Sequence, residues 1–199
     1  MANPQLSKRL HLHALWVGSC EAEGVRLDLA GENLRNAQMP NAVLVGARLN
    51  GADFRNANLA HADFTGADLR EADLRYARLE GADFSAANLK GILLKGAKLA
   101  GANLERGHLN SSDLTETVMT EVNLTGALLR GANLQRVDMS RANLRAADLS
   151  CADLRGALLR GADLGCADLL GANLEEAIVD QNTNFEGARV EMDDLQTLA

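Results

Sequence analysis

The chain contains 199 residues, of which 47% are hydrophobic but only 3% aromatic, so its apolar side chains are almost all aliphatic. This length suits one domain, and a composition with 24% charged residues and no long polar tract argues against a disordered chain. The net charge of -7 argues against the basic footprint of a nucleic-acid-binding protein, and no run approaches the roughly 18 apolar residues of a membrane span.

Residues 1–24 are predicted to form an N-terminal cap built around a short helix over 4–17. Asn3 suits the N-cap position and Pro4 the first helical position. The segment lacks the uninterrupted apolar region of a secretory signal, so we expect a cytoplasmic protein. The apolar stripe of the helix is expected to contain Leu6, Leu10, Ala14 and Val17, widened by Leu12, Leu15 and Trp16.

The histidines and cysteines do not have the spacing of a metal site. His11 and His13 would face different sides of the helix, and we expect them to be solvated or partly packed. Cys20, Cys151 and Cys166 are too few and too scattered for a disulfide framework or a zinc site. We therefore expect unpaired cysteines, no metal and no cofactor.

Residues 25–180 repeat a five-residue unit of the form A(D/N)LXX. Of the 30 positions that lie five apart between Leu34 and Val179, 23 are Leu and the others are Phe, Met or Val. Ala occupies 23 of the 29 positions that lie two residues before a centre, from Ala37 onward. A period of five matches neither a helix nor an ordinary strand. Four units that each turn a right angle would instead close a square coil of 20 residues.

Stacked coils of this kind would bury the repeating Leu and Ala and pair like parallel strands about 4.8 Å apart. The narrow interior explains why a small residue alternates with a large one, since overpacking a core costs about 1–3 kcal/mol per site. The second residue after each centre is Gly at 12 positions and Asn at three. These residues tolerate the positive φ of a type II turn and therefore indicate the corners.

Residues 181–199 are predicted to form an irregular last coil and a C-terminal cap. The hydrophobic phase slips by one residue, since Val179 is followed by Phe185, Val190 and Leu195. We infer one inserted residue within 180–184, with Phe185 plugging the end of the core. The final residues are expected to form a short turn or helix.

Residues 25 to 190 resemble the pentapeptide repeat protein family through these in-phase A(D/N)LXX units. The resemblance implies an all-β fold, a right-handed quadrilateral parallel β-helix, here with a short N-terminal capping helix. It also implies a bacterial, non-catalytic protein. Some members of the family, the quinolone-resistance proteins, resemble duplex DNA in shape and charge and bind DNA gyrase or topoisomerase IV.

The outward positions contain no nucleophile with a neighbouring base and no glycine loop for phosphate. We therefore do not expect an enzyme. The favoured hypothesis is a rigid protein-protein interaction scaffold of unknown partner, monomeric or homodimeric, which binds neither nucleic acid directly nor a membrane. The alternative hypothesis is a DNA mimic that binds gyrase or topoisomerase.

A basic column is the first candidate partner surface, since residues 20 apart would stack along the axis. Asp53 and Asp73 lie two residues before two of its members, which predicts local neutralisation by exposed pairs worth about 0–1 kcal/mol each. The column consists of Arg35, Arg55, Arg75 and Lys95.

An acidic column that contains Asp63 and Asp83 is the second candidate surface, and it tests the DNA-mimic hypothesis. The outward residues of that face sum to a net charge of -2. A duplex as long as the predicted rod, about 36 Å, would have about 20 phosphate charges. The acidic column is therefore a poor imitation of DNA.

An apolar strip on another face is the third candidate surface. Most units have Asp or Asn just before the central residue, but Val118, Leu158 and Ile178 are apolar there and would share one face. Leu93 and Leu128 are similar substitutions elsewhere. Isolated exposed apolar residues are ordinary, whereas three on one face suggest a site for self-association or for a partner.

Overall fold

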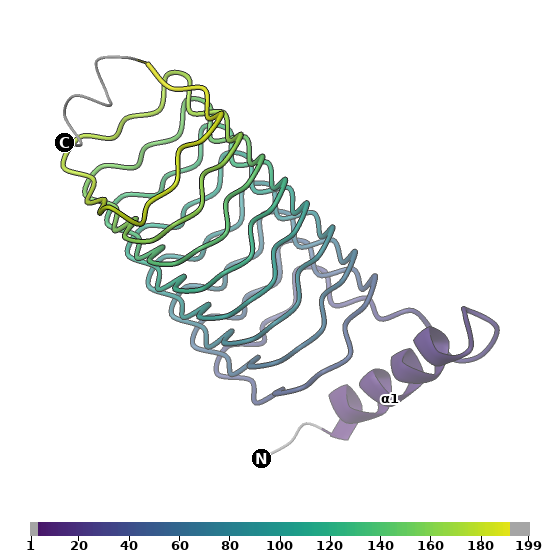
Figure 1. The fold of residues 1–199 in the computed structure, drawn as a ribbon. Coiled ribbons are helices and arrows are strands. Elements are labelled where there is room, and N and C mark those ends of the chain that lie inside the picture. Colours follow the sequence, from purple (N-terminus) through teal and green to yellow (C-terminus); the bar gives the residue numbers. More distant parts are fainter. Residues whose placement is uncertain (1–3, 192–199) are drawn as a thin grey trace.

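The computed structural model describes residues 4–191, which form a rod of stacked coils with one helix across its N-terminal end (Figure 1). The helix α1 spans Pro4–Gly18, one residue longer than predicted. Pro4 is its first residue, where the missing backbone N–H is tolerated. The predicted N-cap, Asn3, lies outside the described residues.

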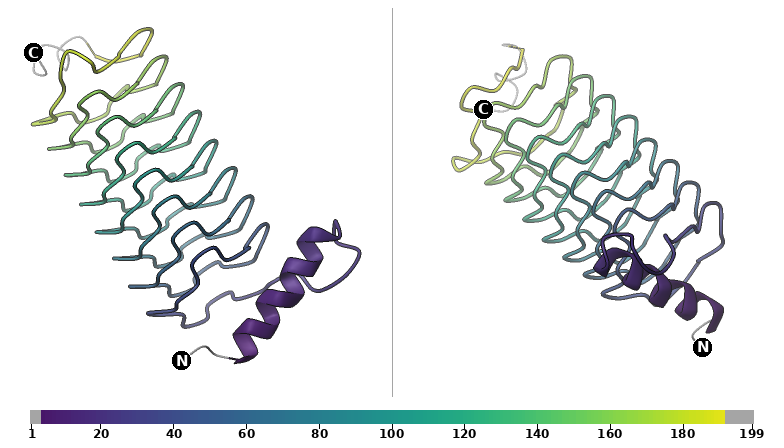
Figure 2. Two further views of the ribbon diagram at one scale, coloured as in Figure 1. Left: turned by 60° about the horizontal axis from the view of Figure 1, so that its bottom comes forward. Right: turned by 90° about the vertical axis from the view of Figure 1, so that its right-hand side faces the viewer.

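The coils are joined by parallel bridges between residues 20 apart, from Asp28 with Arg48 to Leu158 with Ile178. One bridge occurs in each five-residue unit, so each coil has four sides, as the repeat predicts. The bridges are isolated rather than grouped into long strands, because a corner follows after every five residues. The coils lie side by side along the whole rod (Figure 2).

The interior consists of the predicted Leu and Ala positions, which are almost all fully buried from Leu44 to Leu174. Phe64 and Phe84 stack directly, with ring centroids 4.6 Å apart and planes at 2°. Thr117 occupies an Ala position and places a hydroxyl in the core, where Oγ1 donates to the Leu114 carbonyl at 2.6 Å. This hydrogen bond satisfies the buried polar group.

The corners adopt a left-handed conformation whatever residue occupies them. Every corner from Gly31 to Glu176 has a φ between +53° and +69°. The sequence marks only the Gly and Asn corners, yet Glu71 (φ +59°) and Ala86 (φ +54°) are bent in the same way. A residue other than Gly is strained there by roughly 1–2 kcal/mol, so the stacking of the coils imposes the corner conformation.

The one-residue insertion near the C-terminus is confirmed. The last two bridges join residues 21 apart, Asp163 with Asn184 and Asp168 with Arg189. Phe185 packs partly buried against the core. Leu195 and the predicted terminal turn or helix lie outside the described residues.

Asp180 bridges the irregularity that the insertion creates. In the regular coils a corner amide donates to a backbone carbonyl, as Gly156 does to Glu175 at 2.9 Å. The Gly161 amide instead donates to the Asp180 carboxylate, Oδ1, at 2.9 Å. A side-chain oxygen thus replaces the carbonyl that the extra residue displaces.

The inward face of α1 differs from the predicted stripe. His13 is fully buried, whereas Ala14 and Leu15 are exposed, so the expectation of a solvated or partly packed His13 was wrong. Its Nδ1 accepts the Leu27 amide hydrogen at 3.0 Å, and its ring stacks on Trp16 with centroids 5.4 Å apart. The Leu27 amide belongs to the first coil, so no preceding coil supplies a carbonyl for it. The His13 ring provides the acceptor that this buried N–H needs.

Candidate interaction surfaces

The outward Asp and Asn side chains are fixed by their own backbone. In most units the side-chain oxygen accepts the amide hydrogen of the residue two positions later, as Asp63 does from Thr65 at 2.9 Å and Asn123 from Thr125 at 3.1 Å. Such local hydrogen bonds stabilise turns. The side faces therefore present polar groups at regular, fixed positions.

The basic column is neutralised locally, as predicted. Arg55 donates to both carboxylate oxygens of Asp53, with Nε–Oδ1 and Nη2–Oδ2 distances of 2.8 and 2.6 Å. Arg75 makes the same pair with Asp73 at 2.9 and 2.6 Å. The other two cations are held more loosely, since Arg35 lies 3.8 Å from Asp53 and Lys95 lies 3.8 Å from Glu116.

These pairs keep the two carboxylates ionised. The hydrogen bond from Arg55 lowers the pKa of Asp53 below its ordinary value. Burial acts to raise the pKa of Asp73, but hydrogen bonds from the side chain and backbone of Arg75 outweigh it, so that this pKa is also lowered. The column is thus a ladder of closed ion pairs in its centre, with a less tightly held cation, Arg35, at its N-terminal end.

The acidic column becomes a ladder of amides after its first two acids. Asp63 and Asp83 are followed by Asn103, whose Nδ2 donates to Ser85 Oγ at 2.6 Å, and by Asn123, whose Nδ2 donates to Asn103 Oδ1 at 3.0 Å. Among the bridged positions of the column, the acids are therefore separated by a run of amides, and Glu105 is the acid that the face keeps beside that run.

The apolar strip is interrupted. Val118 and Ile178 are 40% and 39% exposed, and Leu158 is half-buried. Asp138 lies in the same column, bridged to Val118 on one side and to Leu158 on the other. Only Leu158 and Ile178 are direct neighbours, so the contiguous apolar surface is near the C-terminal end of the rod.

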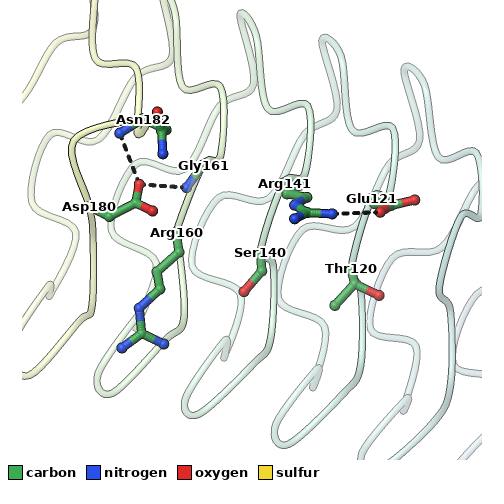
Figure 3. Close-up of a pocket in the computed structure, with 8 residues that line it drawn as sticks. All are labelled: Thr120, Glu121, Ser140, Arg141, Arg160, Gly161, Asp180 and Asn182. Atoms are coloured by element: carbon green, nitrogen blue, oxygen red, sulfur yellow. Dashed lines mark hydrogen bonds and ion pairs between the residues drawn. The ribbon is translucent and has the colours of Figure 1, made fainter.

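A groove of about 590 Å³ runs along the corner beside this strip, and the sequence patterns did not indicate it (Figure 3). Arg141 pairs with Glu121 at 3.5 Å across it. Arg160 makes no ion pair or side-chain hydrogen bond with any described residue. Hydrogen bonds from the backbone amides of Gly161 and Asn182 help to lower the pKa of Asp180. The groove is lined by Thr120, Glu121, Ser140, Arg141, Arg160, Gly161, Asp180 and Asn182.

Within residues 4–191, no group of three or more His, Cys, Asp or Glu side chains is placed to hold a metal ion. Cys20, Cys151 and Cys166 are exposed and unpaired. No helix in the same part of the chain has the length and hydrophobicity needed to cross a membrane.

The family model for pentapeptide repeats matches the chain in overlapping segments that together span residues 26–191, with eight copies. No curated protein matches the sequence.

Solved structures of pentapeptide repeat proteins resemble the chain. Full-length QnrB1, a plasmid-mediated fluoroquinolone resistance protein, aligns with a TM-score of 0.68 at 16% identity over 86% of this chain and 94% of its own. HetL, involved in heterocyst differentiation regulation in Nostoc sp. strain PCC 7120, is 31% identical over 82% of this chain and 86% of its own, with a TM-score of 0.36.

Rfr23 from the cyanobacterium Cyanothece 51142 is 36% identical over 46% of this chain, with a TM-score of 0.46. The match spans 63% of the Rfr23 chain, less than two thirds of its length. At 16% identity, the likeness to QnrB1 supports the solenoid fold and nothing more specific.

Proposed function

Because the chain belongs to the pentapeptide repeat family, we propose that it is a non-catalytic, rigid scaffold that binds a protein partner through a side face of its solenoid. We take the winding to be the right-handed quadrilateral β-helix of the family, and the bridges between residues 20 apart support this. The observation that carries the proposal is the way in which the outward side chains are held.

Those side chains are fixed at a regular spacing rather than gathered into a reactive centre. Asx hydrogen bonds such as that of Asp63, and bidentate pairs such as Arg55 with Asp53, hold them against the backbone. Preordered side chains lose little entropy on association, which favours binding. A surface of this kind suits recognition of another folded protein.

The face that we propose for the partner contains the apolar strip and the corner groove beside it. Leu158 and Ile178 supply apolar area, and Arg160, two residues from Leu158, supplies a cation without a counter-ion among residues 4–191. Interfaces combine an apolar centre with a polar rim, and Arg is enriched in them. The basic column is a weaker candidate because its central cations are already paired.

DNA mimicry is the rival function, and it is suggested by the solenoid fold that the chain shares with QnrB1, a plasmid-mediated fluoroquinolone resistance protein. The charge distribution opposes it. Asn103 and Asn123 replace acids in the middle of the acidic column, and Arg145 pairs with the acid farther along, Asp163, at 3.3 Å. A supercoiling assay with purified gyrase separates the two functions, since inhibition at micromolar protein would support the mimic.

The scaffold proposal is tested by affinity capture from the source cell with wild type, Leu158→Asp and Leu93→Asp. Leu93 is a matched control, because it also replaces the usual Asp or Asn but lies on a different face. A protein that is retained by wild type and by the control but lost with Leu158→Asp supports the proposed face. Equal retention by all three would reject that face, and no specific protein with any of them would reject the scaffold.

A further inference from the structure

The N-terminal end of the solenoid is only partly covered by α1. The helix lies across the first coil (Figure 2) and replaces some of the hydrogen bonds that a preceding coil would make. The guanidinium of Arg9 donates to the Asp28 carbonyl, and His13 accepts the Leu27 amide hydrogen at 3.0 Å. These contacts satisfy only one part of the coil edge.

The edge from residue 33 to residue 38 is left open. The amide and carbonyl groups of Asn33 and Gln38 form no backbone hydrogen bond with any residue in the range 4–191. One coil later, the equivalent amide of Asp53 donates to the Glu32 carbonyl at 2.9 Å. Asn33 and Gln38 thus present the groups with which each later coil binds an extended, parallel chain.

A groove of about 380 Å³ lies between this open edge and α1. Apolar side chains form part of its wall, polar groups of the open edge form the rest, and a single charged side chain lines it. The apolar wall consists of Leu6, Leu10, Leu34 and Met39, and the charged residue is Arg35.

The charge of Arg35 is available to a partner. Its Nε lies 3.8 Å from Asp53 Oδ2, and the side chain is 46% exposed. Asp53 already receives two short hydrogen bonds from Arg55. The stronger pair is therefore between Asp53 and Arg55, and an incoming carboxylate can bind Arg35 without breaking it.

We propose that this edge groove binds an extended segment of a protein partner, which runs parallel to residues 33–39 and has an aliphatic residue followed directly by an acidic one. The segment would add one strand to the solenoid by pairing with Asn33 and Gln38, the mode known as β-augmentation. This inference rests on the proposed scaffold function but uses the end of the rod rather than its side.

The order of the two side chains follows from the register of the coils. Bridged residues lie 20 apart, so each residue of an added strand stacks on its equivalent in the first coil. An aliphatic residue in register with Leu34 faces the apolar wall of the groove. The next residue stacks on Arg35, where a carboxylate completes an exposed ion pair worth up to about 1 kcal/mol, or about fivefold in affinity.

The probe is a ten-residue peptide, acetylated and amidated, with the sequence Ala-Asn-Leu-Glu-Gly repeated twice. Its first four residues match the chain's own residues 102–105. Amide resonances of the full chain are followed by NMR while the peptide is added, and we expect a dissociation constant of about 1 mM. We expect shifts at Asn33 and Gln38. Their absence at several millimolar peptide would overturn the proposal.

A charge exchange tests the ion pair. A peptide with Lys in place of each Glu should bind wild type about fivefold more weakly, and Arg35→Glu should reverse that preference. Arg130→Glu is the control, because Arg130 is an exposed cation on a distant coil and has no ion-pair partner among the residues that the structure describes. Equal affinity of the two peptides for wild type would contradict the role of Arg35.

A proline pair tests the backbone bonds. Gln38→Pro removes an N–H that the fold itself does not use, and it should abolish binding of the peptide. Val43→Pro removes another edge N–H, which lies outside the groove and donates to no backbone carbonyl within residues 4–191, and it should leave binding unchanged. Thermal melting checks that both variants fold. Unchanged peptide binding by folded Gln38→Pro would refute strand addition.

These outcomes are separable from those of the scaffold proposal. A cellular partner that is lost with Leu158→Asp but retained by Arg35→Glu, together with no peptide binding, rejects the edge groove and keeps the side-face scaffold. If peptide binding depends on Arg35 and Leu158→Asp captures the cellular partner as well as wild type does, the proposed side face is rejected and the edge groove is kept.

Discussion

The left-handed corners predict that Gly and Ala exchanges have opposite effects at neighbouring positions. Gly101 has a φ of +65°, and a Cβ added there would meet no atom within 4 Å. Gly101→Ala therefore adds about 1–2 kcal/mol of backbone strain without a steric clash, partly offset by about 0.4–1 kcal/mol because Ala restricts the unfolded chain. The free energy of unfolding should fall by about 0.5–1 kcal/mol, which for a chain of this size lowers the melting temperature by about 1–4 °C.

The reverse exchange at Ala86 should stabilise the protein. Its φ is +54°, so Ala86→Gly relieves a similar strain, partly offset by about 0.4–1 kcal/mol of extra freedom in the unfolded chain. We expect a net gain of about 0.5 kcal/mol. The next residue, Ala87, is fully buried, and Ala87→Gly should destabilise by about 1–2 kcal/mol through the lost methyl group and the added flexibility.

Thermal and urea unfolding of the three variants measure these differences. If Ala86→Gly destabilises as much as Ala87→Gly, or Gly101→Ala has no effect, then the corners are not left-handed and the reasoning is wrong.

Three further predictions concern the ends and the core. Burial lowers the pKa of His13 below its ordinary 6.5. The unfolded state therefore takes up the proton more readily, and the cap should weaken as the pH falls below 6.5. Trp16 fluorescence measured against pH should report this weakening, and His13→Gln should make the fluorescence less dependent on pH. Phe84→Ala should cost about 3–5 kcal/mol in urea unfolding, and a loss below about 1 kcal/mol would contradict the stacked core. Asp180→Ala should speed hydrogen exchange of the Gly161 amide, as should protonation of Asp180 at a pH below its lowered pKa; exchange no faster than in wild type would show that the bond is unimportant.

The coil architecture could be predicted from the sequence because it depends on a local rule repeated many times. A large residue such as Leu104 and a small one such as Ala102 must alternate in a narrow interior, and any error in phase would bury Asp or Asn. The slip after Val179 was visible for the same reason. The repeat did not predict that the Asp180 side chain would accept the Gly161 amide hydrogen in place of a backbone carbonyl.

The ends and the grooves could not be predicted, because they depend on where α1 crosses the first coil. Hydrophobicity favoured Ala14 and Leu15 for its inward face, but the unpaired Leu27 amide requires a hydrogen-bond acceptor, which His13 supplies. The looser pairing of Arg35, by contrast, follows from its sequence. Asn33 stands two residues before Arg35, at the position from which Asp53 pairs with Arg55.

Both binding proposals require a backbone that holds its side chains in fixed positions, and amide hydrogen exchange of the free protein tests this most directly. Strong, uniform protection is expected from the coil that begins at Arg48 to the one that ends at Ile178, with fast exchange at the unpaired Asn33, Gln38 and Val43 amides. Fast exchange throughout the central coils would contradict a rigid scaffold.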